Sequence, residues 1–98
     1  MSVNVVIDST KYNNYIDDSI KKANSGNLKE AKSLLLKAIE IEPSNYKAYI
    51  NLSNVHILLG EAEKSIDLLM NFLDKKNIDF RIADHLGIIY FKYNYLKQ

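Results

Sequence analysis

The residues of this 98-residue chain that could do chemistry are few and poorly placed for catalysis. The sequence has no Cys and two His, His56 and His85, and it lacks the spacings typical of a nucleophile, a phosphate loop or a zinc-binding helix. Asp84 and His85 are adjacent, so their side chains would point in different directions on a helix. No set of residues has the spacing of metal ligands. The sequence therefore predicts no catalytic residue, no metal and no cofactor, and we expect that the chain is not an enzyme.

Polar side chains suited to binding are better represented. Asn51 and Asn54 are three residues apart, which places both amides on one face of a helix. Each amide has two hydrogen-bond donors and an acceptor, which suits contact with a peptide backbone. Lys47 and Arg81 could pair with acidic groups of a ligand. All four could equally be ordinary solvated helix residues, so the pattern leaves both interpretations open.

Composition and charge exclude several classes of protein. Hydrophobic residues make up 47% of the chain and charged residues 26%, which is typical of a globular domain and not of a disordered chain. The net charge of +1 creates no strong field for nucleic acid or an anionic membrane. No segment approaches the roughly 20 apolar residues of a membrane helix, and the N-terminus lacks the basic region of a secretory signal. We expect a cytoplasmic protein with no nucleic-acid partner and no membrane insertion.

An internal repeat organises the elements that must position these residues. A single fixed shift, which brings Tyr12 onto Tyr46, aligns the first unit with the second at seven identities. The other matched pairs are Tyr15 with Tyr49, Ile16 with Ile50, Ser19 with Ser53, Gly26 with Gly60, Leu34 with Leu68 and Leu35 with Leu69. Apolar residues recur at spacings of three and four, which indicates helices, and the glycines lie where helices would end. The pattern predicts helices over 11–24, 28–42, 45–59, 62–75 and 79–95.

A helix–turn–helix period of about 34 residues resembles the tetratricopeptide repeat, whose pattern combines W-x2-L-G-x2-Y, A-x3-F and a Pro. Ala31-x3-Leu35 and Pro43 match in the first unit, and Ala83-x2-Leu86-Gly87-x2-Tyr90 matches in the third. The first half of the first unit departs from the pattern, because Asp18-Ser19 replaces Leu-Gly and Lys22 replaces the aromatic residue. In the second unit, Asn77 stands where Pro is usual. The resemblance covers residues 12–98.

The resemblance implies an all-α fold, a right-handed superhelix of antiparallel helix pairs with about five helices. We expect a single domain over 1–98, with a leader at 1–11 and two repeats at 12–45 and 46–79. The first helix of a truncated third repeat would occupy 80–98. The small residues Ser19, Ser53 and Gly87 are expected where paired helices approach closely, so that a large residue at Gly87 would overpack the pair.

The resemblance also implies a function. In this family the first helices of successive repeats line a concave groove, which binds an extended peptide or a partner helix. We therefore expect a protein–protein interaction module with a protein or peptide partner. The expected groove residues are Lys47, Ile50, Asn51, Asn54, Arg81, His85 and Ile88, flanked by Asn13, Ile16, Asp17, Ile20, Asn24, Ile57, Leu58, Asp84 and Lys92. A two-carboxylate clamp found in some members is matched at Asn51 and Arg81 alone, which argues against that ligand.

The last helix is apolar nearly all round, whereas the end of a repeat array should present a polar face. One expectation is a homodimer through a surface formed by Leu86, Ile89, Tyr90 and Tyr93. Another is that the chain is part of a longer array, a structural element or a region of a larger protein whose activity lies outside these residues. A third is that the tyrosine rings are simply tolerated at the surface.

Overall fold

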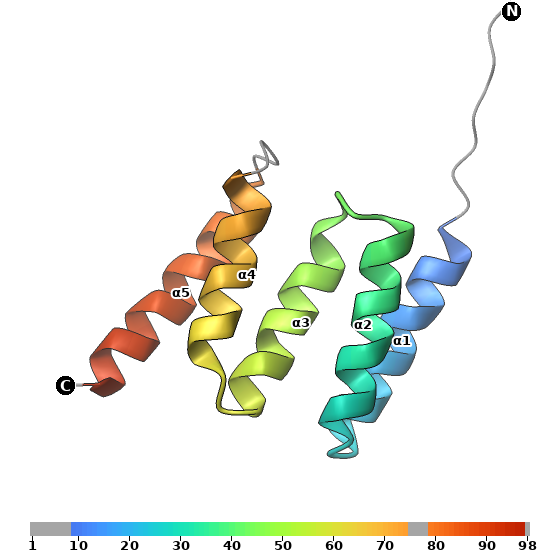
Figure 1. Ribbon diagram of the computed structural model, residues 1–98, viewed down its shortest axis with the longest axis horizontal. Coiled ribbons are helices and arrows are strands. Elements are labelled where there is room, and N and C mark those ends of the chain that lie inside the picture. Colours follow the sequence, from blue (N-terminus) through green and yellow to red (C-terminus); the bar gives the residue numbers. More distant parts are fainter. Residues whose placement is uncertain (1–8, 75–78, 98) are drawn as a thin grey trace, which may run out of the picture.

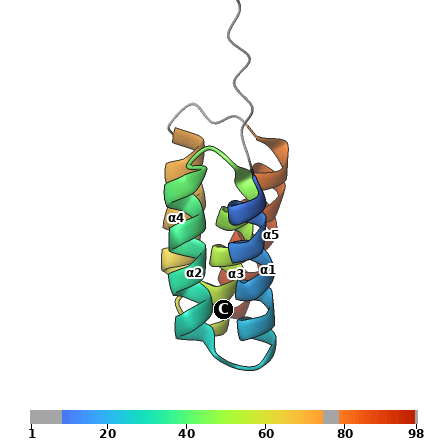
Figure 2. The same ribbon diagram turned by 90° about the vertical axis from the view of Figure 1, so that its right-hand side faces the viewer.

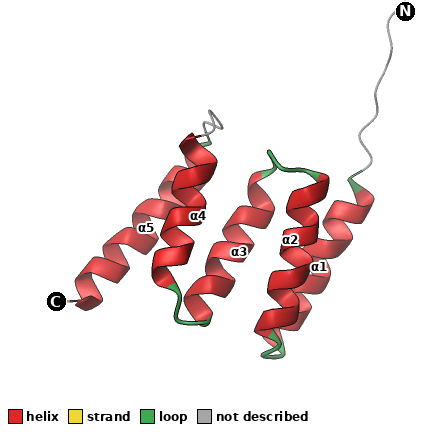
Figure 3. Cartoon of the chain, in the orientation of Figure 1, coloured by secondary structure: helices red, strands yellow, loops and turns green. Residues whose placement is uncertain are grey.

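The computed structural model describes residues 9–74 and 79–97, with residues 94–97 described in their backbone alone. Five helices and no strand occupy this part of the chain (Figures 1 and 3). They are α1 (Thr10–Asn24), α2 (Leu28–Ile41), α3 (Tyr46–Leu58), α4 (Ala62–Asp74) and α5 (Phe80–Lys97). Each bound agrees with the sequence prediction within two residues, which confirms the all-α fold. Most of the expected leader, residues 1–8, and the connection at 75–78 with Asn77 lie outside the described residues.

The helices form two layers. Each helix packs antiparallel against the next, and α1 and α5 in addition each contact α3 (Figure 1). By contrast, α2 and α4 share no contact within the described residues. In Figure 2, α2 and α4 lie on one side of the molecule and α1 and α5 lie on the other. Because successive helices touch in the layer of α1, α3 and α5 and not in the other layer, the array bends with that first layer on its concave side.

Two equivalent glycine turns join the members of each helix pair. Gly26 and Gly60 have φ of 86° and 78°, a backbone conformation that glycine adopts without the steric cost of a Cβ. After Gly26, the Asn27 N–H donates to the Lys22 carbonyl at 2.8 Å, and Glu61 makes the equivalent bond after Gly60 at 2.7 Å. The same bonds thus close α1 and α3, which is why these glycines recur at the repeat period.

The core consists of two clusters of buried residues. In the first, Tyr12 and Leu35 are fully buried, and the Tyr12 hydroxyl accepts a hydrogen bond from the Ala48 N–H at 2.9 Å. In the second, Leu69 and Ile82 are fully buried between α4 and α5. Since α3 contributes to both clusters, it is the central helix of the array.

The structure corrects two expectations about α5. Ile89, which we expected on an exposed surface, is 6% exposed, because it shares the face of Ile82 that packs into the second cluster. Leu86 and Tyr93 are half-buried against that cluster, so Tyr90 is the one exposed member of the expected homodimer surface. Gly87 is exposed, and a Cβ added there would meet nothing within 4 Å, so a larger residue would not overpack this chain.

Candidate functional site

A pocket lies between α1 and α3 on the concave layer. Its volume is about 170 Å³, and it is lined by Ser19, Ile20, Ala23, Asn24, Leu35, Asn51, Asn54, Val55 and Leu58. The buried residues among these form its floor, and the small side chains of Ser19 and Ala23 leave the space open. Leu58 and Ile20, 64% and 42% exposed, stand at its rim. The volume resembles that of apolar cavities of about 150 Å³ that bind benzene, so the pocket can accept one large apolar side chain.

The two asparagines of α3 contribute polar atoms beside this apolar floor. Asn51 Nδ2 donates to the Lys47 carbonyl of its own helix at 2.9 Å, which orients the amide and uses one of its donors. Asn54 Oδ1 lies 3.0 Å from His85 Nε2, and because Oδ1 can only accept, the imidazole donates. Asn51 Oδ1 and Asn54 Nδ2 have no hydrogen-bond partner in the described part of the chain. These two atoms are therefore available to a ligand.

The bond between His85 and Asn54 ties α5 to α3 across the concave layer. Burial lowers the pKa of His85, and the nearby cation of Lys92 lowers it further. The hydrogen bond itself needs only a hydrogen on Nε2, so it fixes the orientation of the Asn54 amide at the edge of the pocket.

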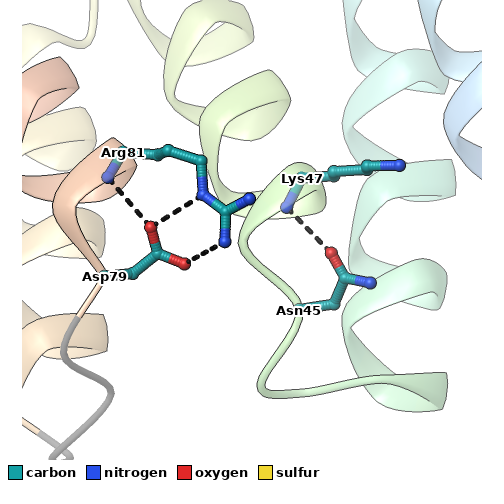
Figure 4. Close-up of polar contacts among 4 residues, drawn as sticks. All are labelled: Asn45, Lys47, Asp79 and Arg81. Carbon is teal, nitrogen blue, oxygen red and sulfur yellow. Dashed lines mark hydrogen bonds and ion pairs between the residues drawn. The ribbon is translucent and has the colours of Figure 1, made fainter.

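Two equivalent caps place Lys47 and Arg81 at the start of α3 and α5 (Figure 4). Lys47 N donates to Asn45 Oδ1 at 3.1 Å, and one repeat later Arg81 N donates to Asp79 Oδ1 at 2.9 Å. The Arg81 guanidinium also binds both carboxylate oxygens of Asp79, at 3.0 and 2.9 Å, and lies 3.6 Å over the Tyr46 ring. This pairing lowers the pKa of Asp79 and raises that of Arg81.

Arg81 is consequently occupied by partners within the chain, Asp79 before α5 and Tyr46 on α3, and our expectation that it pairs with acidic groups of a ligand needs correction. A bidentate carboxylate and an aromatic face already occupy its charged head. Lys47 differs, because the cap uses its backbone N–H and leaves its ammonium pointing away from Asn45 (Figure 4). Of the two expected cations, Lys47 is the one available to a ligand.

The remaining expected groove residues are placed unequally. Ile88 is 54% exposed on α5, whereas Ile50 is half-buried against the second cluster and Ile16 is buried in the first. The sequence did not identify Leu35 and Val55 as part of the site, because buried apolar residues at helical spacing look the same whether they border a pocket or not. The one available sign of a pocket in the sequence was the small side chain of Ala23. A small side chain leaves a pocket only if the neighbouring helix does not fill the space, which the sequence does not show.

The described residues hold no group of three or more acidic, His or Cys side chains that could bind a metal ion. No helix in that same part of the chain is long and apolar enough to cross a membrane. A family model for the tetratricopeptide repeat matches residues 23–82, more than half of the chain. The search of curated proteins found no match to this sequence.

Proposed function

The chain belongs to the tetratricopeptide repeat family, and from that premise we propose that it binds a protein partner on its concave layer. Repeats of this family generally mediate protein–protein interaction. The observation that carries the proposal is the pocket of about 170 Å³ between α1 and α3, which combines an apolar floor with two available amide atoms. That combination is what a peptide ligand requires, because each residue offers a side chain and a polar backbone.

The ligand is a segment that inserts one large apolar side chain into the pocket. Such a side chain gains about 1.5–3 kcal/mol when it leaves water. Asn54 Nδ2 donates to a backbone carbonyl of the segment, and Asn51 Oδ1 accepts from a backbone N–H. The exposed Leu58, Ile20 and Ile88 extend the apolar surface on either side, which suits an amphipathic helix or an extended apolar peptide.

Charge contributes little to this recognition. Arg81 is neutralised by Asp79, and the chain as a whole carries a net charge of +1. Lys47 adds one cation at the start of α3, and Lys92 adds another beside His85 on α5. We therefore expect binding that depends weakly on salt and strongly on the apolar side chain of the ligand.

The test selects peptides from a random displayed library against the full chain and measures the affinity of the selected peptides by calorimetry. Ala23→Leu fills the pocket and should weaken binding at least about tenfold. Asn54→Ala removes an amide at the rim and should weaken it by about fivefold to tenfold. Asn71→Ala, on the opposite layer, is the matched control and should leave the affinity unchanged.

Thermal unfolding separates loss of binding from loss of fold, because Ala23→Leu and Asn54→Ala should retain a cooperative transition. Selected peptides that bind both variants as well as the parent chain would show that the pocket is not the binding site. Peptides that lose affinity equally with Asn71→Ala would show the same.

A further inference from the structure

One polar side chain interrupts an apolar row across the concave layer. Ile20 of α1 and Ile88 of α5 lie one repeat before and one repeat after Asn54 of α3, and the two isoleucines are 42% and 54% exposed. Asn54 is exposed between them, on the helix that contacts both α1 and α5 (Figure 1). A ligand that covers this row therefore meets an amide in the middle of an apolar surface.

The orientation of this amide is set by α5. The His85 ring donates from Nε2 to Asn54 Oδ1 at 3.0 Å, although the two residues lie 31 positions apart in the chain. The oxygen and the nitrogen of an amide point in different directions from one carbon atom. A bond that holds Oδ1 toward α5 therefore turns Nδ2 away from α5, to the side where the pocket lies. Without His85, the amide could rotate and present either atom to a ligand.

A fixed hydrogen-bond donor in an apolar row discriminates between ligands. An amide N–H that loses its water and finds no acceptor weakens a complex more than a new hydrogen bond strengthens it. A helical segment bonds its interior backbone carbonyls within itself, so its backbone offers no acceptor to Asn54. An extended segment leaves its carbonyls free along both edges and can bring one to Asn54 whatever its side chains are.

We propose that His85 is a positioning residue, which makes the pocket selective for an extended segment. The inference rests on the proposed function and narrows it, because the pocket and its apolar rim alone would also suit an amphipathic helix. His85 holds Asn54 as a donor, and the Lys47 carbonyl holds Asn51 as an acceptor. The two amides thus match the carbonyl and the N–H that an extended backbone offers to a neighbour.

Two substitutions that differ in hydrogen bonding test the role of His85. The probe is the tightest peptide that the displayed library yields against the parent chain. His85→Leu places an apolar side chain of similar size there but cannot donate, so the affinity should fall about threefold to tenfold. His85→Gln keeps a donor and should restore the affinity to within about twofold of the parent chain. Asn71→Leu, on the opposite layer, is the control for an added apolar side chain and should leave the affinity unchanged.

A thermodynamic cycle shows whether His85 acts through Asn54. In a chain that already carries Asn54→Ala, His85→Leu should cause no further loss of affinity, because the group that it positions is gone. Equal losses in the two backgrounds would mean that His85 acts independently of Asn54 and would overturn the proposal. Nitrogen-15 NMR of the free chain gives a separate readout, since Nε2 of His85 should carry the ring hydrogen. A hydrogen on Nδ1 alone would mean that the amide is turned the other way, which overturns the proposal too.

Circular dichroism tests the conformation of the ligand. The selected peptide should gain no helical signal when it binds the parent chain. A peptide that becomes helical on binding would overturn the inference and leave the pocket as its site.

The inference and the proposed function fail in different ways, because Ala23→Leu fills the pocket without involving His85. A loss of affinity with Ala23→Leu and none with His85→Leu would remove the role of His85 and keep the pocket as the binding site. Unchanged affinity in both variants would remove the binding site itself. Both His85 variants should retain a cooperative thermal transition, which separates an effect on binding from a loss of fold.

Discussion

Helices α3 and α5 occupy the same position in successive repeats but differ in how much of their surface is covered. Leu52 and Ser53 of α3 are 1% and 0% exposed, whereas their counterparts Leu86 and Gly87 in α5 are half-buried and exposed. The difference does not come from polarity, because α5 carries more exposed aromatic rings than α3. A helix in a repeat array is buried by its neighbours, and α3 has contacts with four helices while α5 has contacts with two.

The largest expected loss of stability tests directly whether α3 is better covered than α5. Leu52→Ala leaves a cavity in a site closed on all sides and should lower the free energy of unfolding by about 2–5 kcal/mol. Leu86→Ala at the equivalent position should cost roughly half as much, because the half-buried side chain can be replaced in part by water. Urea unfolding followed by circular dichroism measures both values at a low protein concentration. Equal losses for the two variants would mean that α5 is as well covered as α3.

An intermediate loss of stability is expected from changes at the start of α3, where the backbone N–H groups are satisfied differently from those at the start of α5. The N–H of Ala48, in the first turn of α3, is satisfied by the distant Tyr12 hydroxyl, whereas Asp79 supplies acceptors locally at the start of α5. Tyr12→Phe leaves that N–H buried and unpaired, which should cost about 1–3 kcal/mol of unfolding free energy. Tyr49→Phe is the matched control, since its hydroxyl donates to the Pro43 carbonyl at an exposed site and its loss should cost far less. A similar loss in both variants would contradict this account.

The smallest effect concerns the turn that joins α3 to the helix covering it. The Glu61 carboxylate accepts from Lys64 Nζ at 2.6 Å and lies 3.1 Å from His56 Nδ1, and these partners lower its pKa to about 2. Since the folded-state pKa is below the ordinary value near 4.5, the contribution to stability is full above pH 4.5 and is lost as the pH falls towards 2. Glu61→Gln should therefore lose less stability than the parent chain between pH 4.5 and 2.5.

Denaturant titrations at several pH values compare the two chains. Because both chains share every other titrating group, the difference between their pH profiles isolates Glu61. Parallel profiles would show that this carboxylate does not stabilise the connection between α3 and α4.

The fold could be predicted closely from the sequence, because its determinants are local. The spacing of apolar residues specifies each helix. Gly26 and Gly60, which adopt a positive φ, specify where α1 and α3 end. The site could be predicted in part. Asn51 and Asn54 share a face by spacing alone, but the pocket beside them needs Leu35 from another helix and the small Ala23 opposite it. No single segment of the sequence contains that information.

The sequence by itself determined the five helices, their internal repeat and the family to which they belong, because hydrogen bonds within a helix and glycine turns depend on neighbours in the chain. The tertiary structure alone decided which apolar residues of α5 are buried. It placed Ile89 in the core and left Gly87 at the surface, and it paired Arg81 with Asp79 and Tyr46 instead of leaving it for a ligand. The physical reason is that burial and pairing depend on which side chains from distant segments pack nearby, which the order of residues within one helix does not specify.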